Sequence, residues 1–174
     1  TEGVYSKLTL EPSLSPSMDI TVSSNFERLL FDLADRDGAQ LASWMQTFAQ
    51  GDLALTPEAL EGVRDVFASM RSSDQETCDE VRTIWQQHGY LLDPHTATGT
   101  RAGRLCQGDP SIPMITLATA HPAKFPAAIA AADINTSPVL PNHLADLFER
   151  EETFEVLPND LQTVQQFMAA NCRA

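Results

Sequence analysis

The sequence predicts a helix-rich α/β fold that has too few strands of its own to form a complete sheet. Amphipathic stretches with helix-start signals recur along the chain and alternate with short apolar stretches. Residues 112–119 (IPMITLAT) are the most strand-like stretch, because they are short, apolar and bounded by a proline and polar residues. Helices without a sheet to cover indicate that part of the domain lies outside this chain.

The first third of the chain predicts a short strand and two helices. Residues 18–22 would form the strand. Ser24 and Glu27 have the spacing of a capping box, which predicts the start of the first helix. The sequence DRDG at 35–38 would end that helix. The second helix would place Leu41, Trp44, Met45 and Phe48 on one apolar face.

Further capping signals predict the helices that follow. Thr56 and Pro57 would be the N-cap and first residue of a third helix. A second capping box, Ser73 with Glu76, would start a fourth helix that ends at Gly89 in a left-handed conformation. Asp93 and Pro94 again have the pattern of an N-cap and first helical residue. The last helices are expected near 123–132, 141–150 and 159–170.

The composition limits the possible partners and setting. The formal net charge is −13, which argues against nucleic acid and anionic membranes as partners. No apolar run reaches the ~20 residues that span a bilayer. The three cysteines form no C-x-x-C pair, so neither a disulfide framework nor a zinc site is indicated, and a reduced, cytoplasmic setting is expected. The chain lacks an initiator Met, which predicts a fragment or a processed chain.

Two loops stand out as candidate functional segments, Asp93–Thr98 and Thr119–Lys124. His95 and His121 each lie at the edge of a predicted element beside a proline, where α/β folds often bind ligands. No two histidines have the i, i+4 spacing of a helical metal site, so no metal is predicted. The only lysines are Lys7 and Lys124, which leaves few candidates for Schiff-base chemistry.

Four segments carry a resemblance to a known family. They are SPSMDITVSSNFERLLF (15–31), GYLLDPHTATG (89–99), LATAHPAKF (117–125) and FEREETFEVLPNDLQTVQQFM (148–168). In combination they resemble the C-terminal portion of threonine synthases of the bacterial and fungal type. The resemblance covers essentially the whole chain and is weakest at 37–73, which would be a helical insertion.

The resemblance implies a fold, a cofactor and a reaction. The fold would be the tryptophan-synthase β-like fold (fold type II) of pyridoxal phosphate (PLP) enzymes, with residues 1–174 as a single unit in the C-terminal part of the large cofactor-binding domain. The reaction would convert O-phosphohomoserine and water to threonine and phosphate, using PLP as an electron sink. The N-terminal half of the same enzyme would be the chain's partner, and the fragment alone is expected to self-associate through its apolar surface.

The resemblance also implies site residues. Thr119 matches the Ser or Thr that hydrogen-bonds the cofactor's pyridine nitrogen, and Asp93 and His95 match a helix start beside the cofactor ring. For Asp93 the alternative is a purely structural N-cap. The family's Schiff-base lysine and phosphate loop have no match here, so no catalytic residue is assigned in this chain and the isolated chain is expected to be inactive. Met18, Asp19 and Asn25 match the family, but no role follows for them.

Two other functions remain open at the level of sequence. The chain could be a stand-alone helical binding module, derived from that enzyme and catalytically dead. It could also belong to another PLP enzyme of the same fold, such as a dehydratase, although the long TAHPAKF match argues against this.

Overall fold

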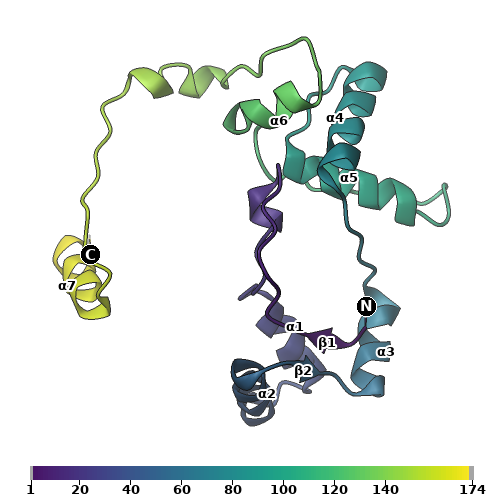
Figure 1. Ribbon diagram of the computed structural model, residues 1–174, viewed down its shortest axis with the longest axis vertical. Coiled ribbons are helices and arrows are strands. Elements are labelled where there is room, and N and C mark those ends of the chain that lie inside the picture. The colour runs from purple at the N-terminus through teal and green to yellow at the C-terminus, as the bar shows by residue number, and fades with distance from the viewer. Residues whose placement is uncertain (1, 173–174) are drawn as a thin grey trace. The chain divides into compact units, whose positions relative to one another are not determined.

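The computed structural model describes residues 2–172, which form helices, loops and one small sheet (Figure 1). The chain divides into two compact units, Thr1–Val139 and Leu140–Ala174. The α-helices are α1 (Phe26–Leu33), α2 (Gly38–Gln50), α3 (Pro57–Val66), α4 (Asp74–His88), α5 (Pro94–Cys106), α6 (Pro126–Ala131) and α7 (Leu161–Asn171). The strands are β1 (Val4–Tyr5) and β2 (Leu53–Ala54), and the 3-10 turns are η1 (Pro16–Met18), η2 (Pro122–Lys124), η3 (Asn142–Leu144) and η4 (Leu147–Glu149).

One apolar cluster joins the β1–β2 strand pair to α1 and α2 (Figure 1). The strands pair antiparallel, with Val4 opposite Ala54. Leu30, Phe48 and Leu53 are buried between these elements, and the Tyr5 ring stacks on Phe48 with 4.2 Å between centroids. The apolar stripe of α2 that the sequence predicted is the face that packs in this cluster, where Phe48 is buried.

A second apolar cluster joins α4, α5 and α6. Its buried residues include Val81 of α4, Ala97 of α5 and Ile129 of α6. The ends of α4 confirm the prediction from sequence, since the Ser73–Glu76 capping box is formed and Gly89 has φ +64°. The N-caps Thr56 and Asp93 are confirmed as well. Local side-chain chemistry therefore sets where these helices begin and end.

Two predictions for residues 18–24 were wrong. In place of a strand at 18–22, the chain forms the turn η1, because Pro16 suits the first helical position and the Asp19 carboxylate closes the loop by accepting the N–H (2.8 Å) and hydroxyl (2.6 Å) of Ser13. The Ser24–Glu27 capping box does not form. Asn25 is the N-cap of α1, so Glu27 is one position too early to reach back to the N-cap backbone.

The strand predicted at 112–119 is also absent. Within residues 2–172, no backbone–backbone hydrogen bond reaches residues 113–118. Ile115 and Leu117 are 81% and 75% exposed. A strand needs a neighbouring strand to pair its N–H and C=O groups, and the part of the chain that the structure describes offers none here.

The later helices are shorter than predicted. The helix expected at 123–132 begins at Pro126, because the residue before a proline is disfavoured in the helical conformation, and η2 precedes it. The helix expected at 141–150 is replaced by the turns η3 and η4. The helix expected at 159–170 is α7, capped by Asp160. No residue of η3, η4 or α7 is buried, so packing does not extend these short turns into a longer helix.

Candidate functional site

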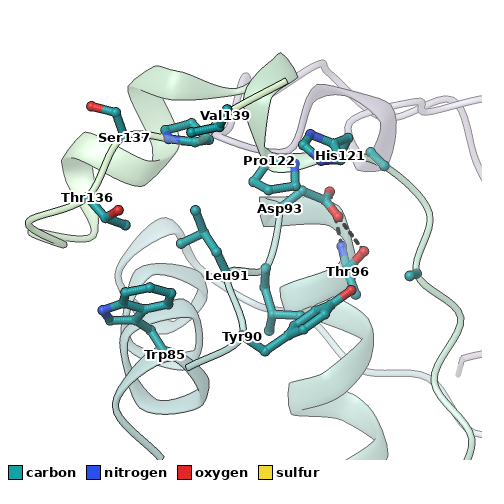
Figure 2. Close-up of a pocket in the computed structure, with 14 residues that line it drawn as sticks. Trp85, Tyr90, Leu91, Asp93, Thr96, His121, Pro122, Thr136, Ser137 and Val139 are labelled. Carbon is teal, nitrogen blue, oxygen red and sulfur yellow. Dashed lines mark hydrogen bonds between the residues drawn. The ribbon is translucent and has the colours of Figure 1, made fainter. Parts of the chain in front are cut away.

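A pocket of about 310 Å³ opens where the start of α5 meets the loop before α6 (Figure 2). It is lined by Trp85, Tyr90, Leu91, Leu92, Asp93, Thr96, Ala118, Ala120, His121, Pro122, Thr136, Ser137, Pro138 and Val139. The two loops that the sequence singled out, 93–98 and 119–124, therefore meet in one place. The remaining lining comes from Trp85 of α4, from residues 90–92 after that helix, from Ala118 and from residues 136–139. Residues 136–139 carried no signal in the sequence.

Asp93 is the most connected side chain at the pocket. It is 1% exposed, and Oδ1 accepts the backbone N–H groups of His95 (2.9 Å) and Thr96 (3.3 Å) at the start of α5. Oδ1 also lies 3.1 Å from His95 Nδ1, and Oδ2 accepts a short hydrogen bond from the Thr96 hydroxyl. Figure 2 shows the Asp93 carboxylate hydrogen-bonded to Thr96. Asp93 thus caps α5 and also orients Thr96.

Thr119 is held at the pocket through Thr96. Its backbone N–H donates to Thr96 Oγ1 at 3.0 Å, while the two hydroxyl oxygens are 3.5 Å apart. The Thr96 hydroxyl proton is already given to Asp93, so Thr96 cannot also donate to Thr119. At 3.5 Å the remaining contact is weak, which leaves the Thr119 hydroxyl available to a ligand. The pocket wall itself is formed by the flanking residues Ala118 and Ala120.

His95 lies next to the pocket without lining it. The ring is 4% exposed and packs on Phe125, with 4.5 Å between centroids. The backbone N–H of Ser17 donates to Nε2 at 3.1 Å, and Nδ1 faces Asp93. Both ring nitrogens therefore have partners within the protein.

His121 is the histidine that lines the pocket. Its Nδ1 accepts the N–H of Ala123 at 3.2 Å and so caps the turn η2. The sequence signal for it was its position at the edge of a predicted element beside a proline, the same signal that pointed to His95. The structure distinguishes the two, because His121 is exposed and His95 is buried.

Neither lysine lines the pocket. Lys7 donates to the carbonyl of Ala49 at 3.3 Å and lies 5.3 Å from the centroid of Phe48, in the cluster around β1 and β2. Lys124 lies 5.7 Å from the centroid of Phe125. The residues around the pocket therefore offer hydroxyl, carboxylate and imidazole groups and no amine.

Two other kinds of site have no counterpart within residues 2–172. No three histidine, cysteine or acidic side chains gather there in an arrangement that could hold a metal ion. None of the helices described there combines the length and apolar character needed to cross a bilayer.

Comparison with known sequences identifies one family. The model of the family "Threonine synthase, C-terminal" matches residues 96–168. Over 95% of the chain, the sequence is 53% identical to the threonine synthase of Pseudomonas aeruginosa, of which it covers 35%. It is 38% identical to the threonine synthase of Schizosaccharomyces pombe, with 87% of the chain and 34% of that protein covered. The chain thus spans about a third of the length of the curated relatives it matches.

Comparison with solved structures leads to the same family. The PLP-bound threonine synthase from Brucella melitensis superposes with a TM-score of 0.85 at 42% identity, over 99% of this chain and 37% of that one. The threonine synthase from yeast gives a TM-score of 0.80 at 33% identity, over 97% of this chain and 38% of that one. These matches confirm the predicted helix-rich fold and favour neither the dehydratase nor the binding-module alternative. On the strength of its sequence and its fold, the chain belongs to the threonine synthase family, to whose C-terminal portion it corresponds.

Proposed function

We propose that this chain is the C-terminal section of a PLP-dependent threonine synthase, which converts O-phosphohomoserine and water to threonine and phosphate. The observation that carries the proposal is the match of 99% of the chain to a PLP-bound threonine synthase, which includes both loops that meet at the pocket. When bound, PLP supplies a sink for the electrons released at the substrate's α and β carbons. This chain would supply one wall of the site.

The residues at the pocket fit a ligand with a ring nitrogen. We propose that the Thr119 hydroxyl hydrogen-bonds the pyridine nitrogen of PLP, because the geometry leaves that hydroxyl free. Asp93 would support it from the pocket wall by orienting Thr96, which in turn holds the Thr119 N–H. His95 would act at the cofactor site through its contact with Asp93. The volume of 310 Å³ is at the lower end of the ~300–1,000 Å³ usual for small-molecule sites, as suits one wall of a larger site.

The missing groups point to an N-terminal portion as the partner. A cofactor lysine would have to come from that portion, since neither Lys7 nor Lys124 lines the pocket. Residues 112–118 offer a place for the N-terminal portion to dock. Met114 and Thr116 lie against α5, where a Cβ on Gly103 would be 3.1 Å from Met114 Cγ and a Cβ on Gly99 would be 3.2 Å from Thr116 Cγ2.

The opposite side of this segment is exposed at Ile115 and Leu117. The alternation has the period of a strand, one face of which contacts α5 through Met114 and Thr116. We propose that the segment pairs with a sheet edge of the N-terminal portion.

The whole of residues 1–174 would then belong to one large cofactor-binding domain, with 37–73 as a helical insertion. The enzyme would work in the reduced cytoplasm, where its three cysteines stay free.

A split-enzyme experiment tests the proposal. The N-terminal portion encoded upstream and this chain would be expressed separately, and threonine and phosphate would be measured from O-phosphohomoserine with PLP present. Each piece alone is expected to be inactive, and the mixture is expected to form both products in equal amounts. If the chain is a binding module, no upstream portion restores turnover. A dehydratase would release a keto acid and ammonia from threonine or serine instead.

A further inference from the structure

The side chain of His95 faces away from the pocket toward a separate segment, residues 13–19. Its neighbours Asp93 and Thr96 line the pocket, whereas His95 does not. On its far side, Nε2 accepts the backbone N–H of Ser17 at 3.1 Å, across 78 positions of sequence. The geometry points to His95 as a positioning residue that holds segment 13–19 to the first turn of α5.

The hydrogen-bond pattern defines the protonation of the ring. An N–H that donates to Nε2 requires that Nε2 carry no proton. The proton of the neutral ring is then on Nδ1, which donates to Asp93 Oδ1 at 3.1 Å. Donors from two sides thus converge on one carboxylate. His95 joins it to segment 13–19, and Thr96 joins it to Thr119.

Within residues 2–172, segment 13–19 has few other anchors. Asp19 closes it on itself through Ser13, and the N–H of Leu14 donates to Asp74 at the start of α4 at 2.9 Å. Ser15 is 5% exposed and Leu14 packs against the cluster of α4, α5 and α6. The His95 link is therefore the side-chain hydrogen bond that fixes this segment to α5, the helix whose start forms the pocket wall.

We infer that, through this link, an ordered segment 13–19 holds His95 and Asp93 in place at the start of α5 and so stabilises the pocket wall. The inference rests on the proposed function only where cofactor binding is concerned. The inference also gives Asp19 a role that the sequence did not reveal. Asp19 fixes the loop conformation that presents the Ser17 N–H to His95.

Two variants of His95 separate the two ends of the ring. The amide of His95→Asn can reproduce the donor near Nδ1 but does not reach Ser17. The longer amide of His95→Gln can place an acceptor near Nε2 and so retain the Ser17 bond. Both lose the ring that packs on Phe125, so the loss of packing is shared and the difference between them reports the hydrogen bond.

The experiment uses the full-length protein, with and without PLP, and hydrogen exchange measured on peptides that cover residues 13–19. His95→Asn should speed exchange of the Ser17 amide by about two- to tenfold, the effect of losing one ordinary hydrogen bond, and His95→Gln should restore most of the protection. Ser17→Ala, which keeps the backbone N–H, is the matched control and should exchange as the wild type does. PLP affinity should fall for His95→Asn and recover for His95→Gln.

The outcomes are distinct. The ¹⁵N spectrum of labelled histidine should show the Nδ1–H tautomer for the signal that disappears in His95→Gln, and an Nε2–H tautomer would overturn the inference. Equal exchange in the Asn and Gln variants would overturn it as well, since the ring packing would then explain the effect. Faster exchange in His95→Asn with unchanged PLP affinity would refute the stabilisation of the pocket wall. The exchange and tautomer measurements need no cofactor, so they stand even if the proposed function fails.

Discussion

Segment 112–118 lies against α5 at Gly99 and Gly103, and it differs from the start of that helix in how many partners this chain supplies. At the start of α5, Asp93, His95 and Thr96 are at most 4% exposed, and their polar side-chain groups have partners within the chain. In segment 112–118, Ile115 and Leu117 are largely exposed, and no backbone–backbone hydrogen bond within residues 2–172 reaches positions 113–118. The start of α5, which lines the pocket, is therefore complete within this chain, whereas segment 112–118, which reaches the pocket at Ala118, needs a partner.

The largest expected effect follows from changing segment 112–118. Leu117→Asp should leave the stability of the isolated chain within about 0.5 kcal/mol, because the side chain is 75% exposed. In the full-length enzyme the same change would bury an unpaired charge, which costs several kcal/mol or prevents assembly. Denaturant unfolding of the isolated chain and yield of soluble full-length enzyme would measure the two effects.

Ile115→Val is the control for this comparison, since it keeps an apolar, strand-favouring side chain and should be tolerated in both forms. If Leu117→Asp is equally harmless in the full-length enzyme, segment 112–118 stays exposed there and its proposed role as a docking strand is wrong.

Changes at the start of α5 should alter the stability of the isolated chain. Asp93→Ala removes the cap of α5 and the acceptor for the buried Thr96 hydroxyl and His95 Nδ1. We expect the free energy of unfolding to fall by about 2–4 kcal/mol, the sum of a lost cap and of buried donors left without a partner. Asp37→Ala, which removes the exposed cap of α2, should cost only about 1 kcal/mol. Equal losses for the two variants would mean that the Asp93 network adds nothing beyond a cap.

The same contrast explains what could be predicted from the sequence. The caps at Thr56, Ser73 and Asp93 and the left-handed Gly89 were predicted because each depends on residues within a few positions. The strand at 112–119 was not found, because strand pairing needs a partner that the sequence of one segment does not contain.

The site shows the same division. The loops 93–98 and 119–124 were predicted, and the structure brings them together at the pocket. Residues 136–139 and the contact between His95 and Ser17 were missed, because both arise from tertiary packing between distant segments. That Asp93 is both a cap and a pocket residue also required the fold, since the two interpretations predict the same sequence pattern.

A smaller effect is expected at Thr119, which follows segment 112–118 and bonds Thr96 at the start of α5. Thr119→Val keeps the shape and the backbone N–H bond to Thr96 but removes the hydroxyl. In the full-length enzyme, PLP affinity should fall by roughly three- to tenfold, as for one lost hydrogen bond of ~0.5–1.5 kcal/mol. Thr119→Asp should also change the absorption spectrum of the bound cofactor, because a carboxylate favours the protonated ring. If both variants keep wild-type affinity, spectrum and turnover, Thr119 is structural only.

The smallest effect concerns pH at the start of α4, where Glu76 forms an ion pair with Arg101 of α5. The N–H and hydroxyl of Ser73, together with the Arg101 guanidinium, hold the pKa of Glu76 below its ordinary value. A carboxyl whose pKa is lowered by folding binds protons more readily in the unfolded chain, so its contribution is present above the unfolded pKa of ~4.3 and is lost as pH falls through the folded pKa. Glu76→Gln has no such titration, yet its amide oxygen can still accept from the Ser73 N–H. The stability difference between wild type and Glu76→Gln should therefore be largest near pH 7 and shrink below pH ~4. Other carboxyls with lowered pKa values, such as Asp79, titrate equally in both proteins and cancel in this difference. Urea unfolding of both proteins at a series of pH values measures it, and a difference that stays constant down to pH ~3 would show that the charge of Glu76 contributes nothing to the cap.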